Sequence, residues 1–272
     1  MLETLKLLLS YDFMVRALVA GSLVALCCAL LGVSLVLKRY SMIGDGLSHV
    51  GFGALSVAAA MNLAPLVIAI PVVVIAAFFI LKIGKNSKVQ SDSAIALVSS
   101  VSIAIGVSVT SLTSGLNTDV YSYMFGSILA MSKSDVVVSV ILSIVVLILF
   151  LVFYHKIFAI TFDSDFAKAT GIHSDLYNTL IAILTALTIV VGMRIMGTML
   201  ISSLIIFPTL SSMGIFRGFR KVVISSAVIS VICFIMGLYN SYSFNLPVGA
   251  SIVLANFVVF LMFMLLGKMR KF

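Results

Sequence analysis

The sequence alternates between long apolar segments and short polar stretches. The apolar segments cover residues 17–37, 43–61, 63–81, 94–113, 135–154, 177–193, 195–214, 222–239 and 247–266. A helix needs about 20 predominantly apolar residues to cross the hydrocarbon core of a bilayer. The pattern therefore predicts an all-α, polytopic membrane protein with about nine transmembrane helices, and we treat residues 1–272 as a single transmembrane domain.

One polar stretch, between the fourth and fifth segments, is too short and too polar to predict a further crossing. Within it, residues 121–131 are predicted to form a short re-entrant or interfacial helix on the outer side. Asp119 precedes that helix and is a candidate entrance or gate residue for cations. The alternative is a solvated loop aspartate with no role in transport.

Composition and charge support a membrane protein with a defined orientation. The chain is 62% hydrophobic and 10% charged, against about 25% charged in a typical soluble domain. With nine crossings and the amino terminus outside, most of the 17 basic residues fall in cytoplasmic loops: Lys38, Arg39, Lys82, Lys85, Lys88, Lys156, Lys168, Arg217, Arg220, Lys221, Lys268, Arg270 and Lys271. Because this bias fits the positive-inside rule, the net charge of +8 reflects topology and argues against nucleic-acid binding.

Asp45 and His49 are ionisable residues inside the second predicted helix, in the stretch SMIGDGLSHVGFG. A spacing of four residues places both side chains on one helix face. Ionisable groups at membrane depth are costly and usually mark a cavity, an ion path or an interface. Carboxylate and imidazole are ligands for zinc and manganese, so the pair predicts a divalent-metal site. A hydrogen-bonded pair that only fixes helix packing remains the alternative.

The glycines around this pair and the three cysteines are predicted to have structural roles. Gly44, Gly46, Gly51 and Gly53 permit a neighbouring backbone to approach closely. Cys27, Cys28 and Cys233 fall within predicted spans without metal-binding spacing, and we expect them to be buried as small apolar side chains.

The longest predicted cytoplasmic connection is residues 155–176. In its FDSDFAKATGI segment, Asp163 is in the position of a helix N-cap, residues 166–169 favour a helix, and Gly171 is a C-terminal stop signal. A short helix in such a loop either caps the bundle or offers its surface to another protein. The sequence contains no G-x-x-x-x-G-K-[ST] motif, so no P-loop for ATP is predicted in this chain.

Four stretches together resemble the membrane permease subunits of metal-type ABC importers, which carry zinc, manganese or iron into bacteria. They are LVLKRYSMIGDGLSHVGFGAL, FGSILAMS, FDSDFAKATGI and GTMLISSLIIFPTLSS. The resemblance implies a fold like that of type II ABC importer permeases and a multi-pass protein of the bacterial inner membrane, with the amino terminus outside and the carboxyl terminus in the cytoplasm. It implies a transport subunit without enzymatic activity or a permanently bound cofactor, and the KRYSMIGDGLSH stretch favours zinc as the transported metal.

The resemblance also implies partners and residue roles. Asp45 and His49 match the D-x-x-x-H pair of the metal path. The short helix near residues 163–171 matches the coupling helix that docks on a separate ATP-binding cassette ATPase, and it involves Asp163, Asp165, Phe166, Ala167, Ala169 and Gly171. The other implied partners are a second copy of the permease and an extracytoplasmic metal-binding protein.

Two ligands do not complete a zinc shell, which usually has four. We therefore expect two copies of Asp45 and His49 to face each other near a dimer axis. Three alternatives remain: an ion-coupled secondary transporter that uses Asp45 as its protonation site, an intramembrane metalloenzyme, and a purely structural subunit. Ligand type does not distinguish zinc, manganese and iron.

Overall fold

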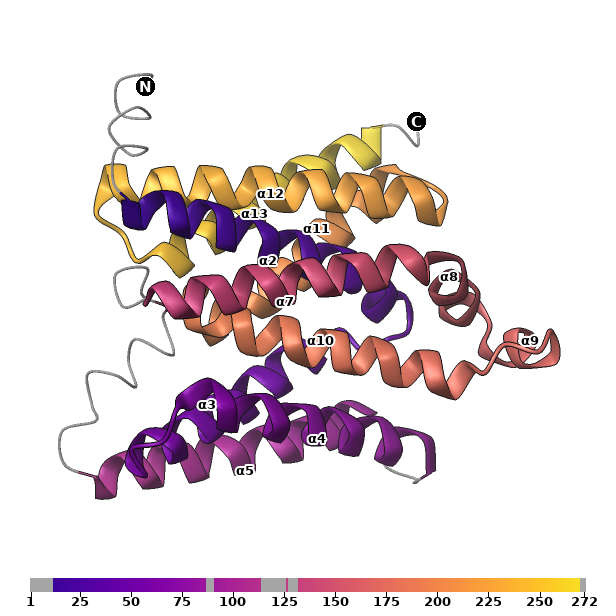
Figure 1. Cartoon of the computed structure of the whole chain (residues 1–272). Coiled ribbons are helices and arrows are strands. Elements are labelled where there is room, and N and C mark those ends of the chain that lie inside the picture. The colour runs from indigo at the N-terminus through magenta and orange to yellow at the C-terminus, as the bar shows by residue number, and fades with distance from the viewer. Residues whose placement is uncertain (1–11, 87–90, 114–125, 127–131, 270–272) are drawn as a thin grey trace.

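The computed structural model describes residues 12–86, 91–113, 126 and 132–269, and every regular element in these ranges is a helix (Figure 1). The helices are α2 (Asp12–Leu37), α3 (Ile43–Ala60), α4 (Pro65–Asn86), α5 (Ser91–Leu112), α7 (Lys133–Val152), α8 (Tyr154–Phe162), α9 (Ser164–Ala169), α10 (Ser174–Met196), α11 (Thr198–Ile215), α12 (Phe219–Phe244) and α13 (Val248–Met269). The predicted all-α class is therefore confirmed.

Each of the nine predicted apolar segments corresponds to one long helix. Seven described helices are long and apolar enough to cross a membrane: α2, α4, α5, α7, α10, α12 and α13. The other two, α3 and α11, have 18 residues each, or about 27 Å at 1.5 Å per residue. These two shorter helices carry the polar side chains of the candidate site described below.

The connection after α7 differs from its prediction. We expected a single short helix between residues 155 and 176, but the structure has two, α8 and α9. The missed helix, α8, begins directly after Phe153 ends α7, and it buries Ile157 and Ile160 against the bundle. Its apolar sequence runs on from the preceding span, so hydropathy alone does not separate the two helices.

Two predictions fall outside the described residues. Asp119 and all of the predicted helix at residues 121–131 except Gly126 belong to the part of the chain that the structure does not describe. The entrance role of Asp119 and the re-entrant helix therefore stay predictions.

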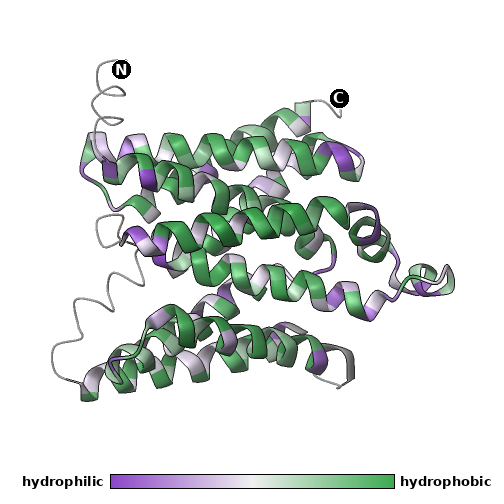
Figure 2. Ribbon diagram, in the orientation of Figure 1, coloured by the Kyte–Doolittle hydropathy of each residue, from purple (hydrophilic) through white to green (hydrophobic). Residues whose placement is uncertain are grey.

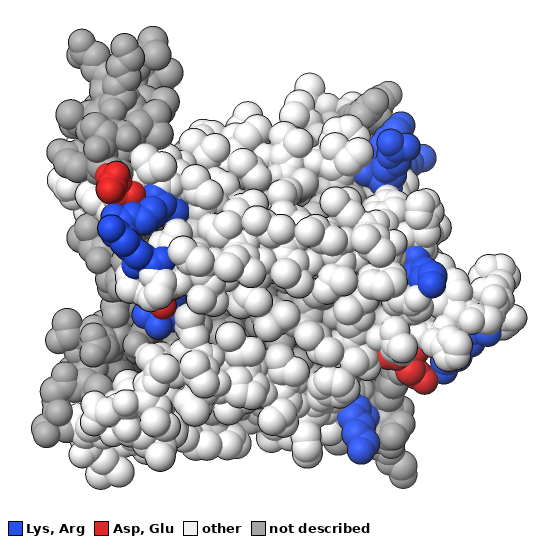
Figure 3. All heavy atoms as spheres, in the orientation of Figure 1, with Lys and Arg blue, Asp and Glu red and all other residues white. Residues whose placement is uncertain are grey.

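The long helices run side by side along one bundle axis (Figure 1). In this view α3, α4 and α5 form the lower part of the bundle, and α2, α12 and α13 form the upper part. Much of the outer surface is apolar (Figure 2), and large apolar side chains of α4, α5, α7 and α13 are exposed. Charged side chains gather at the two ends of the bundle, on either side of an uncharged band (Figure 3). This is the surface expected of a protein surrounded by lipid.

An ion pair between α10 and α7 lies at the end of the bundle opposite α9. Arg194, in the last turn of α10, places Nη2 3.0 Å from Oδ2 of Asp135 at the start of α7, and their side chains are 17% and 14% exposed. The carboxylate of Asp135 also accepts a hydrogen bond from the backbone N–H of Ser132 in a capping box. The pair thus joins two helices that are distant in sequence.

Replacing Arg194 with Met is expected to destabilise the protein, because it leaves the Asp135 carboxylate partly buried without a cation. We expect a loss of about 2–3 kcal/mol in the free energy of unfolding, measured as a fall in melting temperature of the purified protein in detergent. In the double variant Asp135→Asn/Arg194→Met, about half of this loss should be recovered. A double variant no more stable than Arg194→Met would contradict the ion-pair account.

Candidate metal site and coupling surface

The structure brings Asp45 and His49 together on one face of α3. Nε2 of His49 lies 3.5 Å from Oδ1 of Asp45, as the spacing of four residues predicts. The side chain of Asp45 is 39% exposed and that of His49 is 22% exposed. Both can therefore be reached by an ion from outside this chain, although they lie on a helix that is otherwise largely buried.

A third polar side chain, Ser202 of α11, contacts the same carboxylate. Its hydroxyl donates a long hydrogen bond of 3.5 Å to Oδ1 of Asp45. Among the described residues, the contacts of this carboxylate are made through Oδ1. An arriving cation can therefore bind Oδ2 without first displacing a protein hydrogen bond.

Ser202 is not among the site residues that the sequence predicts. It belongs to the stretch GTMLISSLIIFPTLSS, and the adjacent pair Ser202 and Ser203 interrupts an apolar run. That interruption was the available signal. It did not identify the partner, because Asp45 is 157 residues away along the chain.

Glycines of α3 allow the neighbouring helices to approach the pair. A Cβ added at Gly44 would lie 2.8 Å from Ile205 of α11, and one added at Gly53 would lie 2.7 Å from the carbonyl oxygen of Ser102 in α5. Both distances are too short for a real Cβ contact. The predicted close approach of a neighbouring backbone is therefore confirmed at Gly53, whereas at Gly44 the nearest atom is the flexible end of the Ile205 side chain.

The donor set is suited to a weakly held divalent cation. One carboxylate oxygen and one imidazole nitrogen are ligands for manganese, iron and zinc. Within the described ranges, no group of three or more His, Cys, Asp or Glu side chains could hold a metal. A single chain therefore offers two strong ligands at this position, and the cysteines Cys27, Cys28 and Cys233 are buried and unpaired with one another.

The predicted short helix is present as α9, with its predicted ends. Oδ1 of Asp163 accepts hydrogen bonds from the backbone N–H groups of Asp165 (3.0 Å) and Phe166 (2.9 Å), so Asp163 is the N-cap. Gly171 has a φ of +85°, which favours glycine and ends this segment. Figure 1 shows α9 projecting from one end of the bundle, which we call the α9 end.

The side chains of α9 are divided between the bundle and the surface. Ala167 is fully buried, whereas Phe166 is 66% exposed. The remaining predicted coupling residues, Asp163, Asp165, Ala169 and Gly171, are exposed. The Phe166 ring is therefore available for contact with another protein at the tip of a projecting helix.

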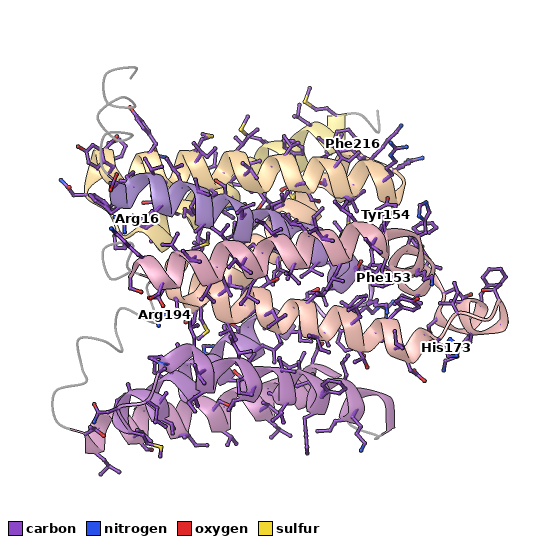
Figure 4. The ribbon with its side chains drawn as sticks, in the orientation of Figure 1. Arg16, Phe153, Tyr154, His173, Arg194 and Phe216 are labelled. Atoms are coloured by element: carbon purple, nitrogen blue, oxygen red, sulfur yellow. The ribbon has the colours of Figure 1, made fainter. Side chains whose placement is uncertain are left out.

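Aromatic rings join the α8–α9 segment to α12. The ring of Phe219, in the first turn of α12, lies 5.2 Å from that of Phe158 and 6.0 Å from that of Phe162 between ring centroids. Tyr154, labelled in Figure 4, packs on the same ring at 5.6 Å. All three rings belong to α8, so α8, which directly precedes α9, is packed on a long helix of the bundle.

The two other histidines of the chain do not join the pair. His155 and His173 are exposed on the α8–α10 connection, and Figure 4 shows His173 at the α9 end.

The fold and the site define a multi-pass membrane protein. It has a candidate cation-binding pair, Asp45 and His49, within its bundle, and a helix that projects from one end. The family described as the ABC 3 transport family matches residues 10–267. The chain belongs to this family, which confirms the resemblance to permeases of metal-type ABC importers and identifies a multi-pass protein of the cytoplasmic membrane.

Individual relatives match over nearly the whole chain. The "Probable metal transport system membrane protein" of Treponema pallidum (strain Nichols) is 30% identical over 97% of this chain and 99% of that protein. The "Manganese transport system membrane protein MntC" of Halalkalibacterium halodurans is 29% identical over 93% of this chain and 87% of that protein. The solved structure of PsaBC from Streptococcus pneumoniae in complex with Fab is similar with a TM-score of 0.86 and 28% identity, over 96% of this chain and 94% of that one.

Proposed function

We propose that this chain is the membrane permease of an ATP-driven importer of a divalent transition metal, and that Asp45 and His49 bind the metal as it crosses. The observation that carries this proposal is the accessible Asp45–His49 pair on an otherwise buried helix. The names of the relatives, which refer to metal or manganese transport, support it. The transported ion is the substrate and not a resident cofactor.

A second copy of the chain would complete the coordination shell. Two copies of Asp45 and His49 facing each other would give two carboxylates and two imidazoles. In each copy, the hydroxyl of Ser202 would donate a hydrogen bond to the carboxylate. A transport site must release its ion, and a shell without thiolates binds zinc or manganese less tightly than a closed structural site. Exposure of both side chains in one chain is consistent with such an arrangement.

Energy would come from a separate ATPase that docks on α9. ATP binding and hydrolysis in that partner would move α9, and the packing of Phe158 and Phe162 on Phe219 would pass the motion to α12. We also propose that an extracytoplasmic metal-binding protein delivers the ion at the opposite end. The chain itself carries no P-loop motif.

The α9 end is proposed to face the cytoplasm. The basic residues at this end whose side chains the structure describes are Lys38, Arg39, Lys82, Lys156, Lys168, Arg217, Arg220, Lys221 and Lys268. Those at the other end are Arg16, Lys133 and Arg194, two of which are labelled in Figure 4. By the positive-inside rule, the amino terminus is then outside and the carboxyl terminus is cytoplasmic.

Manganese is the first candidate metal, and zinc is the second. The zinc preference inferred from the sequence is not confirmed, whereas relatives such as the manganese transport protein MntC favour manganese. The carboxylate and the imidazole suit both ions. The test is ATP hydrolysis by the permease reconstituted with its ATPase and binding protein, measured with manganese, zinc or ferrous iron, and stimulation by manganese above the other two is expected.

The same reconstitution separates this proposal from an ion-coupled carrier that uses Asp45 as a protonation site. An importer driven by ATP should lose uptake when the ATPase is omitted. Uptake that persists without ATPase and stops when the proton gradient is collapsed would contradict the proposal.

A further inference from the structure

A cavity of about 720 Å³ opens at the α9 end of the bundle, away from the Asp45–His49 pair. It lies where α11 ends, α12 begins and α13 ends, and Met213, Phe216, Arg217, Lys221 and Gly267 contribute to its lining. A Cβ added at Gly267 would lie 2.6 Å from the carbonyl oxygen of Gly214, so α11 and α13 are in backbone contact here. The cavity is thus a feature of three packed helix ends.

Two basic side chains line this cavity, and two further basic residues are their neighbours in the sequence. Arg217 and Lys221 line it, Arg220 lies between them in sequence, and Lys268 follows Gly267. The chain has no Asp or Glu after Asp175, and the structure gives no ion pair to these four cations among the residues that it describes. The positive-inside rule explains basic residues at this end, but it does not require two of them in the lining of one cavity. Like charges so placed favour an anion from outside the chain.

The surface next to the cavity is apolar and exposed. Along the last turns of α13, Met264 and Leu266, which flank Gly267 on the helix surface, are 56% and 50% exposed. In Figure 1 this end of α13 lies near the carboxyl terminus, away from α9. The acyl chains of a lipid would cover these apolar side chains, whereas a soluble anion would leave them exposed.

We propose that this cavity binds the headgroup of an anionic phospholipid. The lipid phosphate would contact Arg217 and Lys221, and the acyl chains would lie along the exposed face of α13. Basic pockets between helices on the cytoplasmic side of membrane proteins bind such headgroups. The site is separate from the metal path, so it can be tested whether or not the metal assignment holds.

The test is lipid binding by the purified full-length permease in a neutral detergent, measured by native mass spectrometry. Cardiolipin, phosphatidylglycerol and phosphatidylcholine are titrated separately, and inorganic phosphate is titrated as the soluble probe. Arg217→Gln/Lys221→Gln is expected to lower the affinity for cardiolipin about 20-fold. The matched control, Lys82→Gln/Lys156→Gln, removes two exposed charges from the same end and should change the affinity less than 2-fold.

Arg217→Lys, which keeps the charge, should retain binding, and an unchanged melting temperature of the double variant shows that it has lost affinity and not its fold. Equal losses in the double variant and its control would show diffuse surface attraction and overturn the proposal. Equal binding of phosphatidylcholine, saturation by millimolar phosphate alone, or displacement of the lipid by the ATPase subunit would also overturn it.

Discussion

Asp45→Asn is expected to abolish metal uptake while leaving the permease folded. Asparagine keeps the shape of the side chain and can still accept the hydrogen bond from Ser202, but it removes the negative charge that would bind the cation. Because loss of a supporting residue alone costs about 10–100-fold in metal affinity, loss of this ligand should lower uptake by at least about 100-fold. The measurement is accumulation of manganese and zinc by cells whose other metal importers are deleted.

The control for this change is Asp12→Asn, the same substitution in the first turn of α2, where the residue is exposed. It should leave uptake within about 2-fold of the unmodified permease. Membrane content and melting temperature are measured for both variants. Normal uptake by a folded Asp45→Asn permease would refute the assignment of Asp45 to the metal path. An equal loss of uptake in Asp12→Asn would show that the effect is not specific to Asp45.

Phe166→Ala is expected to uncouple the permease from its ATPase. The Phe166 ring is exposed on α9 while its neighbour Ala167 faces the bundle, so the substitution removes an aromatic anchor without opening the core. Interface anchors of this kind contribute about 2 kcal/mol or more, which corresponds to at least about 30-fold weaker binding of the ATPase. The measurements are the affinity of the two purified subunits and metal-stimulated ATP hydrolysis.

Leu176→Ala is the matched control, because Leu176 is a similarly exposed apolar residue in the first turn of α10, close to α9 in sequence. It should bind the ATPase nearly normally. The Phe166→Ala permease should still bind metal, since the Asp45–His49 pair is untouched. Normal ATP-driven uptake by Phe166→Ala would exclude the exposed ring as the docking anchor.

The long helices could be predicted because the signal for each lies in a single continuous stretch of sequence. A run of apolar residues marks each span, and Asp163 and Gly171 mark the ends of α9 through their own backbone preferences. Helix α8 could not be separated from the preceding span in this way. Only the backbone turn at Phe153 divides them, and the residues on both sides are apolar.

In the candidate site, too, contacts within one helix could be predicted from the sequence and contacts between helices could not. Asp45 and His49 are one helical turn apart, so their contact follows from the period of the helix. Ser202 and the Asp135–Arg194 ion pair depend on how distant helices pack, and no local pattern specifies that. The family was recognised from four motifs together, and the match over residues 10–267 confirms it.

The most direct test of the central claim is equilibrium binding of manganese and zinc to the purified full-length permease. The account predicts one bound ion for every two chains, and it predicts that Asp45→Asn eliminates this binding while Asp12→Asn does not. An Asp45→Asn protein that binds the same number of ions with the same affinity would contradict the account.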